Sequence, residues 1–325
     1  MRIGLFTDSY RPAQNGVVVV VNVTRCELES MGNEVYVFAP SANIFNKVSE
    51  VDKNDDHLIH FAAIRGMGFK EGQLSVFFPP VLLEQIRSLK LDVLHFFTAG
   101  QMALFCCYAA RHLNIALVGQ HCTDTYEYSD SYKLLKVGYA AMSVLMPAAV
   151  EMTPKQRANF ATLYAFKKGD ANWGKRLVAG ELAMWYQACD EVIAVSQKSA
   201  NQLKGIAERN DARFDITIIP TGVNPPPTVS NAKVMAFRRD FGIEPEDEVV
   251  TYYGRLGQEK NLAMLIPTIE KVLEKRPHAK LMFGGDWEYR SELEKLAFES
   301  SARDRIVFIG CYNHDDIGVL NAVSK

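Results

Sequence analysis

The chain has 325 residues, of which 48% are hydrophobic and 23% are charged. This length suits two domains of roughly 100 to 200 residues better than a single α/β core, and the composition is ordinary for a globular protein. The formal net charge of -2 gives no overall electrostatic basis for binding nucleic acid, which favours a strongly basic face. We therefore expect no nucleic-acid partner.

The six cysteines indicate reduced thiols rather than a disulfide framework or a metal site. None stands in a C-x-x-C pair, and the adjacent Cys106 and Cys107 lie in an apolar, helix-like run. The chain opens directly on a strand-like segment, without the pattern of a signal peptide. Its longest apolar run, residues 137–150, is too short to cross a bilayer. These features favour a cytoplasmic protein with no bound metal ion or cofactor.

In the first part of the chain, short apolar runs alternate with longer segments of helical periodicity, a pattern typical of βαβ units in a parallel sheet. The apolar runs predict strands at residues 3–6, 34–38, 93–96, 116–119, 191–195 and 216–219. The periodic segments predict helices at residues 17–31, 80–89 and 101–113. Residues 127–186 fit neither pattern well and are interpreted as a helical excursion from the domain.

The alternation is interrupted by three consecutive prolines that begin at Pro225, a stiff segment expected to act as a linker. It then restarts, with predicted strands at residues 248–253, 280–283 and 305–309 and predicted helices at residues 262–275 and 290–299. The sequence thus predicts an α/β protein of two doubly wound domains, residues 1–225 and 226–325. Three strands make only half of such a sheet. We therefore expect the second domain to be truncated, with an unpaired strand edge and an uncovered face; a small but whole domain is the alternative.

The excursion interleaves apolar and basic residues. Its apolar part, residues 134–150, is followed by six cations: Lys155, Arg157, Lys167, Lys168, Lys175 and Arg176. Such a segment can form an amphipathic surface for anionic lipid head groups. A helical excursion with an ordinary solvated basic face is the alternative, and the sequence leaves both open.

The first candidate site follows the first predicted strand. In an open parallel sheet, ligands bind at the carboxyl ends of the strands. Gly16 would let the backbone approach a phosphate closely, and the helix that begins near residue 17 points its amides at that anion. Asp8 and Tyr10 in the same loop are candidates for the acceptor or sugar side of the site. A plain βα turn is the alternative; the G-x-G-x-x-G fingerprint is absent, which counts against a dinucleotide-dependent dehydrogenase.

Polar side chains also follow the strand predicted at residues 116–119. His121 can bind a sugar hydroxyl or help position an acceptor, although a histidine at such a position is often structural. Its neighbours Thr123, Asp124 and Tyr126 are all polar at one strand end, which favours a functional role. We take these four residues as candidates for binding the sugar or the acceptor.

The third candidate site follows the first strand of the second domain. Arg255 and Lys260 flank a glycine-containing turn and can converge on one diphosphate, the first as a planar fork and the second as a compact charge. A solvated basic loop is the alternative. Two cations around a tight strand-to-helix turn are the more specific arrangement.

Taken in order, these motifs resemble glycosyltransferase family 4, whose members are retaining enzymes of the GT-B fold. The opening MRIGLFTDSYRPAQNGV is similar to that of diacylglycerol glucosyltransferases and phosphatidylinositol mannosyltransferases. Later blocks of the family are matched in the expected order by ACDEVIAVSQKSANQL, ITIIPTGVN, YYGRLGQEKNL, LMFGGDWEYRSELEKLA and RIVFIGCYNHDDI. The resemblance covers essentially the whole chain.

The resemblance implies two Rossmann-like domains that face a cleft and move a hexose from a nucleotide sugar, such as UDP-glucose or GDP-mannose, to an acceptor hydroxyl. It implies that the Gly16 amide binds the donor phosphate and that His121 contacts the transferred sugar. Arg255 and Lys260 would hold the diphosphate and stabilise its charge as the glycosidic bond breaks. The leaving phosphate would deprotonate the acceptor, so that no protein nucleophile is needed.

A membrane glycerolipid is the leading acceptor, which would place the protein at the inner face of the membrane. A soluble carbohydrate acceptor is one alternative, and a non-catalytic protein that binds nucleotides or sugars is another. Two departures from the family pattern matter. The glycine turn of the donor domain reads Gly285-Asp286-Trp287, with Trp287 where a second glycine is usual. The family's E-x7-E block would follow beyond Lys325, so we expect this chain alone to have no appreciable transferase activity.

Overall fold

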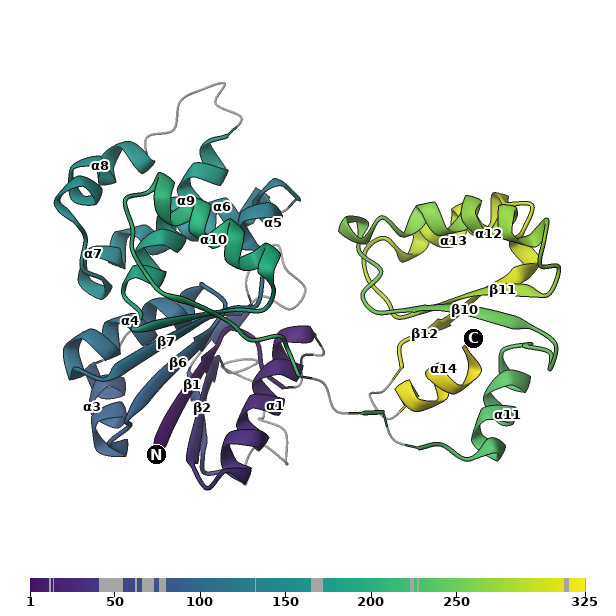
Figure 1. The fold of residues 1–325 in the computed structure, drawn as a ribbon, viewed down its shortest axis with the longest axis horizontal. Coiled ribbons are helices and arrows are strands. Elements are labelled where there is room, and N and C mark those ends of the chain that lie inside the picture. The colour runs from purple at the N-terminus through teal and green to yellow at the C-terminus, as the bar shows by residue number, and fades with distance from the viewer. Residues whose placement is uncertain are drawn as a thin grey trace. The chain divides into compact units, whose positions relative to one another are not determined.

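The computed structural model describes residues 1–11, 13, 15–40, 55–61, 63–65, 73–75, 80–131, 133–164, 172–222, 225–226, 228–312 and 316–324. The chain divides into two compact units, unit 1 (Met1–Val223) and unit 2 (Asn224–Lys325) (Figure 1). The boundary expected at residue 225 lies beside this division. Residues 223, 224 and 227 around the expected linker are outside the described residues.

Unit 1 is built on a seven-stranded parallel sheet in the order β3-β2-β1-β6-β7-β8-β9. Its strands are β1 (Arg2–Thr7), β2 (Glu34–Pro40), β3 (Leu58–Phe61), β6 (Val93–Phe97), β7 (Ala116–His121), β8 (Glu191–Ala194) and β9 (Ile216–Ile218). A separate antiparallel pair consists of β4 (Ala63–Arg65) and β5 (Gln73–Ser75). The predicted strands of this unit are present, whereas β3, β4 and β5 were not predicted.

Both faces of this sheet are covered by helices, which explains why its strands are almost wholly apolar. Ile3 and Leu5 of β1 pack with Val21 of α1 (Gly16–Ser30) on one face. Phe6 points to the other face and packs against Phe105 of α4 (Gln101–Leu113). Helix α3 (Pro80–Leu89) also has the predicted bounds. This arrangement brings the carboxyl ends of β1 and β7 to the same edge of the sheet.

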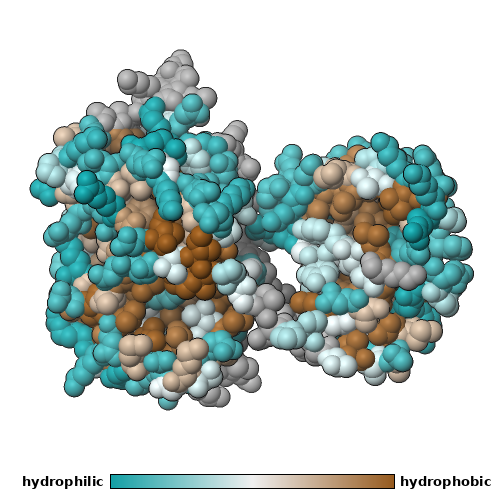
Figure 2. Space-filling view, in the orientation of Figure 1, coloured by the Kyte–Doolittle hydropathy of each residue, from teal (hydrophilic) through white to brown (hydrophobic). Residues whose placement is uncertain are grey.

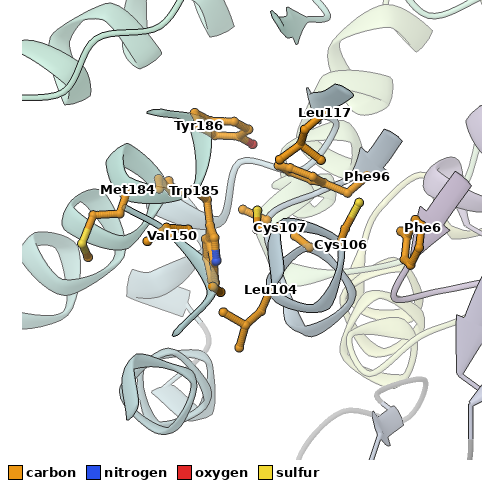
Figure 3. Close-up of a cluster of buried hydrophobic side chains, with 14 of the residues drawn as sticks. Phe6, Phe96, Leu104, Cys106, Cys107, Leu117, Val150, Met184, Trp185 and Tyr186 are labelled. Carbon is orange, nitrogen blue, oxygen red and sulfur yellow. The ribbon is translucent and has the colours of Figure 1, made fainter. Parts of the chain in front are cut away.

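The predicted excursion is helical. It contains α5 (Thr125–Ser131), α6 (Lys133–Met142), α7 (Met146–Ala149), α8 (Pro154–Tyr164) and α9 (Trp173–Gln187), and α10 (Gln197–Arg209) follows β8. Helix α9 is a core element, because Trp185 and Tyr186 are wholly buried beside Cys106 and Cys107 of α4 (Figure 3). Lys167 and Lys168 lie outside the described residues. No described helix is both long and apolar enough to cross a membrane.

Unit 2 has a three-stranded parallel sheet, β10 (Glu248–Tyr253), β11 (Ala279–Gly284) and β12 (Ile306–Gly310), in that order. Helices α12 (Leu265–Leu273) and α13 (Arg290–Glu299) cover one face, where the predicted helix at 262–275 begins as a short 3-10 turn. The other face is covered by α11 (Asn231–Asp240) and α14 (Ile317–Val323) (Figure 1).

The expectation of an uncovered sheet face in unit 2 is therefore wrong. Val249 and Met282 point to that face and pack against α11 and α14. Helix α11 was not predicted, although the spacing of Val234, Phe237 and Phe241 is that of an amphipathic helix and Ser230 caps its first turn.

The edge of this sheet is more open than its faces. Among the described residues, the outer side of β10 pairs only through an isolated parallel bridge between Val249 and Ser324. The hydroxyl oxygens of Thr251 and Ser324 lie 2.6 Å apart next to it. Val250 in the same strand is half exposed, and hydrophobic residues are visible on the face of unit 2 shown in Figure 2. The expected open strand edge is thus present along much of β10.

Candidate functional site

Asp8 stands directly after β1 and binds the first turn of α4. Its Oδ1 accepts a hydrogen bond of 2.9 Å from the Met102 amide. Burial raises the pKa of this carboxyl to about 6, and the amides of Met102 and Gln101 oppose the shift. Gly100 leaves room for the carboxylate, since a Cβ there would lie 2.2 Å from Oδ2. Asp8, a candidate for the acceptor side of the site, therefore caps the N-terminus of α4.

Gly16 is the first residue of α1 and is exposed. A Cβ added at this position would meet no heavy atom within 4 Å. The preceding Asn15 caps the helix by accepting a hydrogen bond of 3.1 Å from the Val18 amide. The packing of unit 1 therefore does not require a glycine at position 16, whereas the close approach of a ligand to the helix N-terminus would.

Tyr10, the other candidate of this loop, lies in the core. Only 5% of it is exposed, and it packs in one cluster with Val21 and Phe97. Its hydroxyl lies 3.4 Å from the Arg11 guanidinium, which donates to it. This position favours a structural role over contact with an acceptor.

His121 is the last residue of β7 and is 3% exposed. Its Nδ1 lies 2.9 Å from the hydroxyl of Tyr186, a residue of α9 that no sequence motif singles out. Its Nε2 is buried and has no hydrogen-bond partner among the described residues. Burial lowers the pKa of the ring, and the charge of Asp124 and the side chain of Gln202 act in the opposite direction. His121 is thus a neutral ring with one open nitrogen.

The three polar residues that follow His121 are tied to neighbouring elements. Thr123 Oγ1 lies 3.0 Å from Thr98 Oγ1, after β6. Asp124 Oδ1 accepts from the Glu127 amide at 3.1 Å and so caps α5. Both oxygens of Asp124 also accept from Gln202 Nε2 of α10, each at 3.1 Å. The sequence could not separate these structural bonds from ligand contacts, because α10 is distant along the chain.

Tyr126, the last candidate of this group, is half-buried on α5. The ammonium of Lys175 lies 5.0 Å from the centroid of its ring, within the range of a cation–π contact. The same ammonium is 3.1 Å from a carboxylate oxygen of Glu127. One of the basic residues of the excursion is therefore bound to the domain rather than freely solvated.

In unit 2, Arg255 follows β10 and is held from two sides. Its Nη2 lies 3.1 Å from Glu259 Oε1, and its guanidinium carbon is 5.2 Å from the centroid of the Trp287 ring. Glu259 was not singled out from the sequence, although its i,i+4 spacing from a basic residue was visible. Lys260 is exposed at the end of a short 3-10 helix, and its side chain has no hydrogen bond or ion pair within the described residues.

The turn after β11 interlocks with the turn after β10. Gly285 has φ +129°, and a Cβ there would lie 1.9 Å from the carbonyl oxygen of Gly254. The Leu256 amide donates to the Asp286 carbonyl at 3.2 Å. The Asp286 carboxylate is exposed and accepts from the amide of Trp287. The tryptophan that replaces the usual second glycine is thereby fixed against Arg255.

Two Rossmann-like units with such turns at the carboxyl ends of their strands define the GT-B class. Solved structures agree with this fold. That of Anabaena Alr3699/HepE in complex with UDP-glucose has a TM-score of 0.60 and 15% identity, and the match covers 100% of this chain and 72% of the other. The catalytic domain of starch synthase IV from Arabidopsis thaliana, bound to ADP and acarbose, has a TM-score of 0.59 and 12% identity, with 99% and 76% covered.

The chain belongs to Glycosyltransferase Family 4, whose sequence pattern matches residues 14–225, while that of the glycosyl transferases group 1 matches residues 234–322. The alpha-monoglucosyldiacylglycerol synthase of Streptococcus pneumoniae is 24% identical over 95% of this chain and 61% of its own length. The enzyme of the same name from Acholeplasma laidlawii is 24% identical over 98% of the chain and 72% of its own length. The family resemblance expected from the motifs is confirmed. The chain spans about three fifths of the length of the pneumococcal relative.

Proposed function

We propose that the protein is a retaining hexosyltransferase that moves a sugar from a nucleotide-sugar donor to a hydroxyl of a membrane glycerolipid. The observation that carries this proposal is the turn after β10, where Arg255 is oriented by Glu259 and Trp287 while the exposed Lys260 stays available. Two cations of this kind suit a diphosphate. The open position beside Gly16 and the open nitrogen of His121 add a phosphate contact and a sugar contact in unit 1.

In this reaction the bond between the anomeric carbon and the donor phosphate breaks, and negative charge builds on the leaving diphosphate. Arg255 and Lys260 stabilise that charge, and preorganised cations do so without reorienting at the moment of reaction. The leaving phosphate takes the proton of the acceptor hydroxyl on the same face of the sugar, so the configuration at the anomeric carbon is retained.

The choice of donor and acceptor rests on the relatives. Both monoglucosyldiacylglycerol synthases are named for a glucosylated diacylglycerol, and the similar Anabaena structure holds UDP-glucose. UDP-glucose and diacylglycerol are therefore the first pair to test. GDP-mannose and soluble carbohydrates are the alternatives, and binding of a nucleotide sugar without transfer would indicate a non-catalytic protein.

The test is the Arg255→Ala, Lys260→Ala double variant, made in the whole protein. We expect transfer to fall by at least about 100-fold, because loss of a single charge-stabilising donor already costs about that much. The Lys271→Ala, Lys295→Ala variant, which removes two other exposed cations of unit 2, should keep its activity. Both are compared by initial rate with radiolabelled donor. Turnover in the first variant equal to that of the second would remove the donor-site assignment.

A membrane acceptor is supported by the surface of the excursion. Val137, Val144 and Leu145 are 62%, 78% and 43% exposed. A cavity of about 260 Å³ beside α8 is lined by both apolar and basic residues: Lys155, Phe160, Leu163, Arg176, Met184 and Arg209. Exposed apolar side chains and basic residues within the same excursion together favour binding to an anionic lipid surface.

We expect the protein to sediment with anionic vesicles and to be released by salt, since charge attraction is screened beyond about 10 Å at 0.1 M ionic strength. The Val137→Ser, Val144→Ser, Leu145→Ser variant should bind them more weakly. Equal binding to neutral and anionic vesicles, or binding to neither, would favour the solvated-face alternative.

A further inference from the structure

The hydroxyl of Tyr186 is hydrogen-bonded to His121. Tyr186 is wholly buried in α9, and its hydroxyl oxygen lies 2.9 Å from His121 Nδ1. Within the described residues, this is the one hydrogen bond that the hydroxyl makes. The two rings meet edge to face, with centroids 5.7 Å apart. The pair joins α9 to the carboxyl end of β7, where the open nitrogen of His121 lies.

The absence of a side chain at Gly119 leaves room for the ring of Tyr186. A Cβ at Gly119, two residues before His121, would lie 2.7 Å from the Phe96 ring and 3.1 Å from the Tyr186 ring. Phe96 and Tyr186 lie nearly parallel, with centroids 5.9 Å apart (Figure 3). On its other side the tyrosine contacts Phe214 at 5.8 Å between centroids. Tyr186 is therefore held in one orientation, with its hydroxyl directed at the histidine.

This geometry decides which ring nitrogen carries the proton. Burial raises the pKa of Tyr186 well above its ordinary value, so the phenol keeps its hydrogen. If Nδ1 of His121 were protonated, it would donate to the phenol oxygen and leave the O–H of Tyr186 buried without an acceptor, an unfavourable state. The hydroxyl therefore donates to Nδ1, and the neutral ring carries its hydrogen on Nε2.

The opposite side of the ring agrees with this assignment. The carboxylate of Asp124 only accepts hydrogen bonds, so the amide nitrogen of Gln202 must face it, as the two contacts of 3.1 Å show. The Gln202 side chain also raises the pKa of His121, but within the described residues its hydrogen bonds are to Asp124 and not to the ring. No described side chain completes a hydrogen bond to His121 Nε2. An Nε2–H donor in a buried position is thus left for a group outside the described residues.

We propose that Tyr186 is a positioning residue that fixes His121 in the Nε2–H tautomer, so that the ring donates a hydrogen bond to a hydroxyl oxygen of the transferred sugar. The contact with the sugar rests on the proposed function. The tautomer does not, because it follows from Tyr186, Gly119 and the buried ring alone.

The tautomer is tested by long-range ¹H–¹⁵N correlation spectra of the full chain labelled with ¹⁵N-histidine, in which protonated and unprotonated ring nitrogens differ widely in shift. The signals of His121 are those that disappear in His121→Asn. We expect Nε2 to be protonated in the wild-type protein and both tautomers to be populated in Tyr186→Phe. Tyr139→Phe is the matched control, because that wholly buried hydroxyl binds the Ala99 carbonyl and Thr125 instead.

Protonation of Nδ1 in the wild-type protein would overturn the proposal, as would an unchanged tautomer in Tyr186→Phe. If Tyr186→Phe fails to fold, the wild-type spectrum still decides the tautomer.

In the whole enzyme, Tyr186→Phe should lower kcat by about tenfold with little change in the donor KM, because orientation of the reacting sugar is lost. Adding it to His121→Asn should cost nothing further, and additive losses would contradict a role through His121. A protein without transferase activity would refute the proposed function but leave the spectral result standing.

Discussion

The turn after β11 in unit 2 contains Gly285, and the connection after β1 in unit 1 leads to Gly16, the first residue of α1, but the two glycines differ in what requires them. At Gly285 the backbone has φ +129°, and a side chain would collide with the Gly254 carbonyl. At Gly16 the backbone is helical and a side chain would meet open space. The fold therefore accounts for the first glycine and does not account for the second.

This difference shows how a structural glycine can be separated from a functional one. Where packing demands a glycine, its presence says nothing about a ligand. Where packing leaves room, as at Gly16, the absence of a side chain is compatible with the close approach of a ligand to the backbone. Substitutions at these glycines test whether the two positions differ in this way.

Gly285→Ala should lower the free energy of unfolding of unit 2 by about 3 to 5 kcal/mol, because a strained backbone angle and a collision with backbone each cost roughly 1 to 3 kcal/mol. Gly242→Ala is the control, since Gly242 also has positive φ (+60°) but no atom within 4 Å of the added Cβ. It should cost only about 1 to 2 kcal/mol. Urea unfolding followed by the fluorescence of Trp287, the tryptophan of unit 2, measures both. Equal losses would show that the collision is relieved by movement of the turn.

Gly16→Val should leave the free energy of unfolding within about 0.5 kcal/mol of wild type but weaken donor binding by about 100-fold, as the side chain would fill the position of the phosphate. Gly138→Val adds the same atoms at another helical glycine, one that also has no heavy atom within 4 Å of an added Cβ. That control should leave donor binding unchanged. Calorimetric titration with UDP-glucose compares the two variants. Wild-type affinity in Gly16→Val would show that the connection between β1 and α1 is an ordinary βα turn without a role in donor binding.

Asp8→Asn tests the buried carboxylate that directly follows β1. The pKa of Asp8 is raised from 3.8 to about 6 in the folded protein, so the folded state binds more protons than the unfolded state between these values. Stability contributed by this group is therefore present at low pH and lost as the pH rises through about 4 to 6, by about 3 kcal/mol. The amide variant should remove this slope, which urea unfolding at several pH values would show. A slope that persists would mean that the carboxyl is not buried as described.

The parallel sheets were predictable because each central strand is buried on both faces and so forms a continuous apolar run. The edge strand β3 and helix α11 were not predicted: in β3 the polar His60 follows only two apolar residues, and α11 carries its apolar stripe among basic residues. The covering of the second face in unit 2 was missed for the same reason, since it depends on α11. The helical excursion was recognised, but the complete burial of Tyr186 within it was not.

For the site, the sequence located the strand ends correctly but could not tell what each polar side chain binds. Asp8 caps a helix that begins 93 positions later, at Gln101, and Asp124 binds Gln202 of α10. A capping carboxylate and a ligand-binding carboxylate have the same local sequence pattern, so only the tertiary contacts separate them. The pairing of His121 with Tyr186 likewise joins residues that are 65 positions apart.

The cysteines of the chain differ in reactivity, which allows the two units to be labelled with dyes. Burial raises the pKa of the Cys106, Cys107 and Cys189 thiols and brings that of Cys122 to about 12, which suppresses the reactive thiolate. Cys26 and Cys311 are exposed; one belongs to α1 of unit 1 and the other follows β12 of unit 2. The unaltered chain can therefore accept one thiol-reactive dye on each unit. Energy transfer between the two dyes would then report whether the units approach each other when a nucleotide sugar binds.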